Sequence, residues 1–255
     1  MRSNFGASTL LLLAPALCPA ARLSEPAERA FATYVATVET RLAAQKPLGG
    51  GVRVEPVNGG TWHVTGGLLH HWRAAALVRG ASPRDMLALL RDYDHLAQYY
   101  APEVVSSRAL SDHGNRATLA MRFRKQRVIT VVLDAEFENR SGLSGAGRGY
   151  SFSRSMHIWQ VEHAGSPDER RRPEGDDDGF LWRLNSYWTF EQTSEGLRIE
   201  CETVSLTRDI PAGLGWLVTP IIETLPRDSL EFTMTATRNA LVKTANRRPE
   251  NDRAN

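Results

Sequence analysis

The C-terminal part of the chain, from Gly179 to Leu241, places two strand patterns directly before one long helical pattern. The first run, FLWRLNSYWTF, alternates large apolar side chains with smaller or polar ones; its apolar members are Phe180, Trp182, Leu184, Trp188 and Phe190. The second run, LRIECETVSL, repeats the alternation with Leu197, Ile199 and Cys201. A period of two is typical of half-buried strands, and Gly196 between the runs predicts an antiparallel hairpin.

The hairpin leads into RDIPAGLGWLVTPIIETLP, which is apolar but interrupted by prolines and glycines at 211, 213, 215 and 220. These residues predict a loop with a short helical turn, and they argue against an uninterrupted helix or a membrane span. From Pro226 to Lys243, apolar residues recur at helical spacing. We therefore expect one closing helix, with the apolar parity of the hairpin (Trp182, Leu184 and Trp188) facing it.

Four further strands are predicted before the hairpin, at residues 68–78, 116–124, 127–137 and 149–159. Between the first two lies SPRDMLALLRDYDHLAQYYAPEVV, in which Ser82 is the predicted N-cap of a helix and Pro83 occupies its first turn. The chain thus reads as an α+β protein built on an antiparallel sheet.

This order of elements resembles the START-like helix-grip superfamily, also called SRPBCC, of polyketide cyclase/dehydrase and lipid-transport proteins. The resemblance rests on RDYDHLAQYYAPEVVSSRAL, VITVVLDAEF, LWRLNSYWTF, SLTRDIPAGLGWL and the helix that starts at LPRDSL. It implies a curved antiparallel sheet that grips the long C-terminal helix around an apolar cavity, with a START-like domain over residues 50–244. Members of the superfamily range from lipid carriers to cyclases, so the fold alone selects no chemistry.

The N-terminus, MRSNFGASTLLLLAPALCPAA, combines Arg2, a short apolar run and small residues at Ala20 and Ala21. This composition predicts a signal peptide over residues 1–21 and an exported protein, periplasmic or secreted. If the signal is removed, Cys201 is the only cysteine, which excludes an intrachain disulfide.

An amphipathic helix is predicted over residues 25–46, outside the part that carries the resemblance. Its apolar residues, at 31, 34, 35, 38 and 42, share one face. Docking against the domain is the expected arrangement, and contact with a membrane surface is the alternative. The tail over residues 245–255 lacks apolar anchors and is expected to be disordered.

Charge argues against nucleic-acid binding, because the formal net charge of +2 is spread along the chain and no Lys/Arg cluster alternates with aromatic residues. The sharpest charge runs, Arg170–Arg172 and Asp176–Asp178, have opposite signs within one segment. We expect them to form a solvated, self-neutralising loop between two strands.

Metal and cofactor sites are not predicted. His70 and His71 are adjacent, so on a strand they point to opposite faces and cannot share an ion. The glycines of GLSGAGRGY lead into a strand and do not form a phosphate loop. Cys201 is expected to be a core thiol without reactivity.

Polar side chains on the apolar parity of the strands are the candidate ligand contacts. Arg154 shares its parity with Tyr150, and a cation inside an apolar cavity would anchor the polar end of a ligand. The alternatives are a bulge that reverses the parity or a side chain that reaches the sheet rim. The complete candidate set is Arg154, Tyr150, Met121, Trp182, Ser186, Trp188 and Thr203.

Three functions are compatible with these features. The first is an exported module that binds a lipid or another hydrophobic small molecule, without catalysis. The second is a cyclase/dehydratase-type enzyme on a polyketone-like substrate, in which Arg154 and Tyr150 would orient carbonyl groups. The third is a structural or interaction domain whose core is filled by its own side chains. No catalytic triad or acid/base pair can be read from the chain, which favours the first.

Overall fold

The computed structural model describes residues 21–42, 53–126, 129–145, 147–209 and 215–247, with backbone alone over 215–223. Its main sheet is antiparallel, and the spatial strand order is β2 (Arg53–Val64), β3 (Gly67–Val78), β11 (Gly196–Thr207), β10 (Arg183–Thr193), β7 (Arg148–Glu162), β6 (Thr130–Leu143), β5 (Arg116–Gln126) and β4 (Val104–His113). The short strand β8 (Arg170–Arg171) pairs with β7. A second pair joins β1 (Ala21–Arg22) to β9 (Asp176–Asp177).

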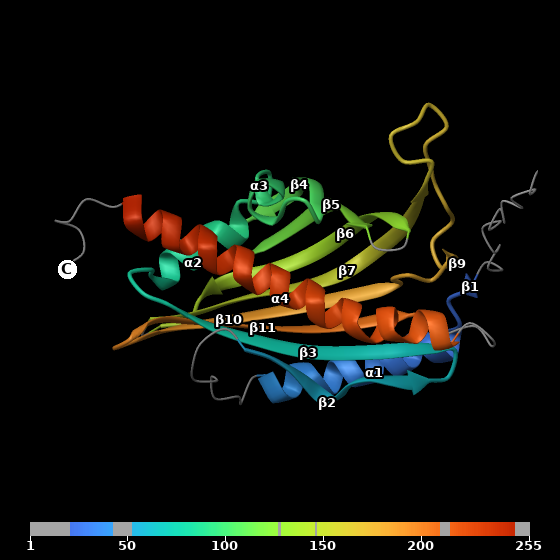
Figure 1. Ribbon diagram of the computed structural model, residues 1–255. Coiled ribbons are helices and arrows are strands. Elements are labelled where there is room, and N and C mark those ends of the chain that lie inside the picture. The colour runs from blue at the N-terminus through green and yellow to red at the C-terminus, as the bar shows by residue number, and fades with distance from the viewer. Residues whose placement is uncertain (1–20, 43–52, 127–128, 146, 210–214, 248–255) are drawn as a thin grey trace, which may run out of the picture.

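Two long helices lie on opposite faces of this sheet. Helix α4 (Gly215–Arg247) crosses one face, and α1 (Glu25–Leu42) lies against the other (Figure 1). We call the face toward α4 the inner face and the face toward α1 the outer face. The predicted α+β helix-grip architecture, with an extra N-terminal helix, is thereby confirmed.

Two short helices, α2 (Pro83–Arg91) and α3 (Leu96–Tyr100), also pack on the α4 side. Helix α2 begins as the sequence predicts, with a capping box in which Asp85 N–H donates to Ser82 Oγ and Asp85 accepts from Ser82 N–H. Each bond satisfies an amide that the first helical turn leaves unpaired. The cap therefore fixes where the chain turns from β3 to cover one end of the sheet.

Each face of the sheet has its own core. The inner core includes Trp188, Phe190, Ile199, Cys201 and, from α4, Leu230, Met234 and Leu241. The outer core is smaller and comprises Ala27, Phe31, Val38, Leu69, Trp182, Tyr187, Val204 and Leu206. Alternate residues of the same strands thus enter different cores, as the period of two requires. Docking of α1 through its apolar face, the expected arrangement, is confirmed.

The structure corrects the predicted extent of the closing helix. Helix α4 begins at Gly215, ahead of the predicted start at Pro226, and includes Pro220. A proline removes one backbone hydrogen bond and bends a helix without necessarily ending it. At the other end α4 continues to Arg247, into the predicted tail; the rest of that tail, the signal peptide up to Ala20 and residues 43–46 lie outside the described residues.

The orientation predicted for Trp182 is wrong, whereas Leu184 and Trp188 contact the inner core as predicted. Trp182 is 2% exposed in the outer core, and its Nε1–H donates to Asp177 Oδ1 at 3.1 Å. Leu181, the residue before it, packs on the inner core, so the alternation breaks before β10 begins. A strand parity holds only within the extended segment, and Trp182 precedes that segment.

The charged segment after β7 is more ordered than predicted. Arg170 pairs with Glu162, and Arg172 pairs with Asp178. Asp177 is buried, accepts from Gly179 N–H at 2.6 Å, and belongs to the strand that pairs with β1. Among the ion pairs of the described residues, only Arg172–Asp178 joins the two charge runs, as expected, whereas Arg170 and Arg171 pair with Glu162 and Asp134 of the main sheet. These pairs hold the segment against the sheet.

None of the helices in the described part of the chain is long and apolar enough to cross a membrane.

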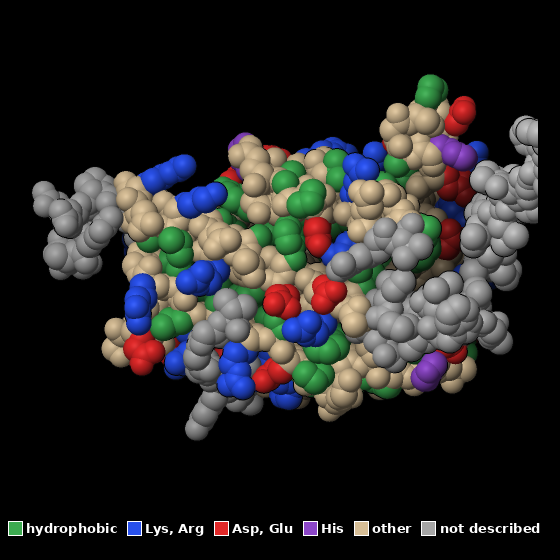
Figure 2. Space-filling model, in the orientation of Figure 1, with side chains coloured by type: hydrophobic (Ala, Val, Ile, Leu, Met, Phe, Trp, Pro, Cys, Tyr) green, Lys and Arg blue, Asp and Glu red, His purple; other side chains and the backbone are tan. Residues whose placement is uncertain are grey.

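On the face that carries α4, the described acidic and basic side chains are interspersed (Figure 2). Each of the four strands predicted before the hairpin extends past at least one of its predicted ends, and the long strands β2 and β4 are additional to the predicted ones.

Candidate functional site

The inner face has a closed end and an accessible end. At the closed end, where α2 packs, Met86, Phe190, Leu197 and Leu241 are almost fully buried. At the other end, six apolar side chains that contact the inner core are only partly buried: Met121, Phe123, Val131, Leu181, Leu184 and, from α4, Phe232. Apolar side chains that stay partly exposed at the edge of a core are the expected lining for a hydrophobic ligand.

A row of neutral polar residues crosses the inner face between these two ends. Asn139, Ser153, Ser186 and Thr203 are paired in register across β6, β7, β10 and β11. Trp72 of β3 is the next partner and completes the row. Its indole Nε1 is buried and has no hydrogen-bond partner among the described residues.

One end of this row is held in place by hydrogen bonds. Tyr93, which follows α2, donates from its hydroxyl to Asn139 Oδ1 at 3.0 Å. The amide of Asn139 donates to Ser151 Oγ at 2.9 Å and to Ser153 Oγ at 2.8 Å. Burial raises the pKa of Tyr93. The tyrosine therefore remains a neutral donor at physiological pH.

The site predicted from sequence is only partly assembled. The structure places Ser186, Thr203, Met121 and Trp188 on the inner face, in keeping with their predicted orientation. Ligand contact by these residues remains a prediction. Trp182 lies in the outer core, as described above.

Arg154 and Tyr150 lie on the outer face, so their predicted inward orientation is wrong. Arg154 donates from Nε and Nη2 to the carboxylate of Glu39 on α1 at 2.7 and 2.5 Å. The ring of Tyr150 contacts Phe152, which contacts Tyr187 of the outer core. The ion pair raises the pKa of Arg154, so the guanidinium stays charged and bound to α1.

A bulge in β7 explains this error. Glu136 and Phe137 of β6 pair with His157 and Ser155, so Met156 has no partner. One extra residue exchanges the two faces of a strand. Ile158 is therefore in the inner core, although the residues before the bulge that share its parity face outward.

The residues that sequence reasoning missed are Tyr93, Asn139, Ser151 and Ser153. Ser151 and Ser153 alternate along β7 with Tyr150 and Arg154. Because the predicted parity turned Tyr150 and Arg154 inward, it turned the two serines outward. Asn139 follows Phe137 on the inward parity of β6, which was a usable signal. Tyr93 lies outside any regular element, and only the tertiary structure brings its hydroxyl to the sheet.

The outer face beneath α1 carries a charged network. Tyr34 Oη lies 2.8 Å from His71 Nδ1, and His71 Nε2 lies 2.9 Å from Glu202 Oε2. Arg41 of α1 also donates to Glu202. Burial acts to raise the pKa of Glu202, but these bonds outweigh it and lower the pKa to about 2. The network resembles a hydroxyl–imidazole–carboxylate relay, yet burial raises the pKa of Tyr34, which makes it a poor nucleophile. Its evident role is to dock α1.

Two further titratable groups near the inner face have shifted pKa values. His70 is buried between Thr61 Oγ1 and Thr207 Oγ1, each at 2.9 Å, and burial lowers its pKa to about 4. Burial raises the pKa of Cys201, which keeps the thiol protonated. His70 and His71 face opposite sides of β3, as predicted, and the described residues contain no cluster of three or more metal-ligating side chains.

No known family model matches this chain, and no curated protein matches it. Among solved structures it is similar to the STAR-related lipid transfer protein from Xanthomonas axonopodis, at 15% identity and a TM-score of 0.47, over 78% of this chain and 100% of that one. It is similar to the Zhui aromatase/cyclase from Streptomyces sp. R1128, at 14% identity and a TM-score of 0.46, over 71% and 95%. Human STARD10 covers 85% of this chain, with 81% of its own, at 9% identity and a TM-score of 0.42.

Proposed function

We propose that this protein is an exported module that binds a lipid or another hydrophobic small molecule between the inner face of the sheet and α4. The observation that carries the proposal is the partly buried apolar lining at the accessible end, which includes Met121, Leu184 and Phe232. Burying such surface against a ligand supplies about 25 cal/mol per Å². The lining is therefore a source of affinity that the chain itself leaves unused.

The row of neutral polar residues supports a ligand with an uncharged oxygen-bearing group. The buried Nε1–H of Trp72 can only donate, so it suits a carbonyl, hydroxyl or ether oxygen. Ser186 and Thr203 offer hydroxyls that both donate and accept. At the rim of this face, Lys125 pairs with Glu103, so these two charges neutralise each other.

A cyclase/dehydratase-type enzyme has less support. The two residues that would have oriented carbonyl groups, Arg154 and Tyr150, lie on the far side of the sheet. The described part of the inner face contains no paired acid and base that could move a proton between substrate atoms. Tyr93 and Asn139 can orient an oxygen atom, which a carrier also requires.

Export is proposed from the sequence alone, because residues 1–20 lie outside the described part. If the signal is cleaved, intact-mass analysis of protein from the native host will find a mature N-terminus close to Ala21 or Arg22. Accumulated protein that keeps residues 1–20 would remove this part of the proposal.

Ligand binding is tested by native mass spectrometry of the full chain after mild purification, followed by organic extraction. A co-purifying hydrophobic species supports the proposal; a ligand-free protein that also fails to take up fluorescent lipids indicates a filled core. Asn139→Ala and Asn185→Ala form a matched pair, because both asparagines are 3% exposed but Asn185 contacts Tyr187 of the outer core. We expect both variants to lose stability and only Asn139→Ala to lose ligand.

A further inference from the structure

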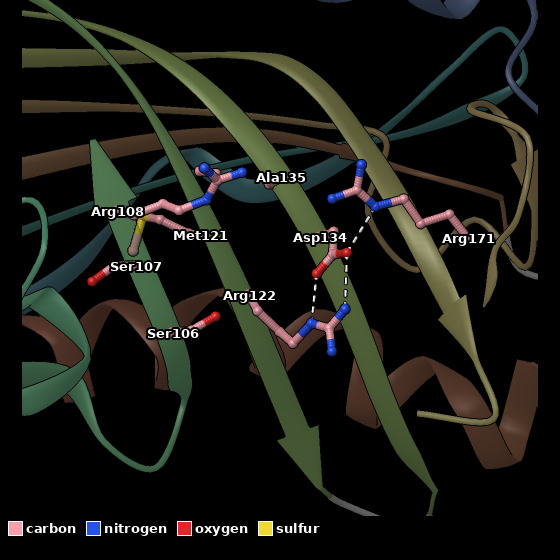
Figure 3. Close-up of a pocket in the computed structure, with 9 residues that line it drawn as sticks. Ser106, Ser107, Arg108, Met121, Arg122, Asp134, Ala135 and Arg171 are labelled. Carbon is pink, nitrogen blue, oxygen red and sulfur yellow. Dashed lines mark hydrogen bonds and ion pairs between the residues drawn. The ribbon is translucent and has the colours of Figure 1, made fainter. Parts of the chain in front are cut away.

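The outer face of β4, β5 and β6 is not covered by α1, and it holds a pocket of about 190 Å³. Figure 3 shows the pocket, which is lined by Ser106, Ser107, Arg108, Ala120, Met121, Arg122, Asp134, Ala135 and Arg171. Three arginines from β4, β5 and β8 reach it. Residues far apart in the sequence thus bring three cations to one small cavity.

Two of these arginines are held by internal partners. Asp134 accepts from Arg122 Nε at 2.6 Å, from Arg122 Nη2 at 3.0 Å and from Arg171 Nε at 2.8 Å. Arg122 also pairs with Glu169 at 2.8 Å. Burial acts to raise the pKa of Asp134, but the two guanidinium groups outweigh it and lower the pKa, so the carboxylate remains ionised. Asp134 therefore serves to position cations.

Arg171 is positioned while its terminal nitrogens stay available. Its guanidinium carbon lies 4.4 Å from the ring centroid of Trp159, which fixes the plane of the group. Asp134 takes the Nε–H, and within the described part of the chain no partner occupies either Nη group. A cation that is already ordered loses little conformational entropy when it binds an anion.

Arg108 is the uncommitted cation of the pocket. Arg108 is exposed and makes no hydrogen bond or ion pair with any described residue. This includes Glu136 of β6, which is paired in register with Ala120, the β5 partner of Arg108. In Figure 3, Arg108 and Arg171 extend toward the same gap from opposite sides, with Asp134 and Arg122 below them. The pocket lining therefore holds three arginines and one carboxylate, that of Asp134.

We propose that this pocket binds an oxyanion of the phosphate class, held between the guanidinium groups of Arg108 and Arg171. Guanidinium groups match phosphate oxygens with paired N–H donors, which is why arginine is preferred at such sites. The hydroxyl of Ser106 lines the same cavity and can add one more donor. A free phosphate compound and a phospholipid headgroup offer the same chemistry.

The test uses inorganic phosphate and the full chain labelled with ¹⁵N. Phosphate is expected to shift the amide signals of Ser106, Arg108 and Ala120 in a saturable manner. Arg108→Gln is expected to weaken this binding by about tenfold, the loss of one charge-assisted contact. Arg238→Gln on α4 removes the same charge from another exposed site and is the matched control, with an expected change under about twofold.

A second arm separates the two sources of phosphate. Co-sedimentation with phosphatidylcholine vesicles that contain phosphatidic acid identifies a headgroup if Arg108→Gln reduces it and Arg238→Gln does not. A soluble phosphate compound is identified if wild type and both variants bind the vesicles equally while Arg108→Gln binds inorganic phosphate more weakly. Equal weakening of phosphate binding by both variants, or shifts spread over the whole surface, would overturn the proposal.

Discussion

The two faces of the main sheet are built from alternate residues of the same strands, yet they have opposite chemistry. Glu202 and its neighbour Thr203 show the contrast: Glu202 is ion-paired beneath α1, whereas Thr203 belongs to the neutral row facing α4. Beneath α1, the outer face is covered by a helix that brings its own charged partners. The inner face offers hydroxyls, an amide and partly buried apolar side chains. We therefore expect α1 to be a structural cover, the proposed hydrophobic ligand to bind on the α4 side, and the proposed oxyanion to bind where α1 does not cover the outer face.

The largest expected effect is on the inner core. Trp188 is 6% exposed and packs against that core, so Trp188→Ala should lower the free energy of unfolding by about 3–5 kcal/mol through cavity formation. Chemical denaturation measures the change. Trp159→Ala, on the outer face beneath Arg171, is the control and should cost clearly less. A larger loss of unfolding free energy in Trp159→Ala than in Trp188→Ala would contradict the placement of Trp188 in the inner core.

Glu202 tests the charged network on the outer face. Its pKa is lowered from 4.5 to about 2 in the folded protein, so its stabilisation is fully present above pH 4.5 and is lost as the pH falls toward 2. A shift of this size corresponds to about 3 kcal/mol. Stability measured across this window should fall in wild type and change much less in Glu202→Gln. Similar slopes in both proteins would show that the carboxylate is not held by its cations.

His70, on the inner face, makes stability depend on pH over a second range. Burial lowers its pKa from 6.5 to about 4, so the folded state binds its proton less readily than the unfolded state does. The associated stability, about 3 kcal/mol, is present above pH 6.5 and is lost as the pH falls toward 4. Thermal unfolding of wild type and His70→Gln between these values measures it. A pH dependence that survives the substitution would place the responsible group elsewhere.

Arg154 has the smallest expected effect and separates the two faces most directly. Its side chain is 53% exposed, so the pair with Glu39 should contribute only about 0.2–1 kcal/mol. Arg154→Met should therefore lower the melting temperature slightly and leave uptake of a fluorescent fatty acid unchanged. Weakened uptake at unchanged stability would return Arg154 to the ligand site.

The order of the elements and most of the fold follow from local patterns in the sequence. Alternation in β10 and β11, the capping box at Ser82 and the helical spacing after Pro226 are local signals, and each produced the expected element. The period of two also sorted Ser186 and Thr203 onto one face. Such patterns reflect steric and burial constraints that act within a few residues, so one sequence suffices to read them.

Where a strand is irregular, the face that a residue occupies depends on packing between distant segments. The bulge at Met156 and the break before β10 reversed the parity, which moved Arg154 and Trp182 to the side of α1. The tertiary structure also brings Tyr93 to Asn139, and Arg108 to the same pocket as Arg171, from distant parts of the chain. Alternation along one strand shows which side chains share a face. Which of the two faces packs against α4 depends on contacts with other strands and helices, and those contacts are non-local.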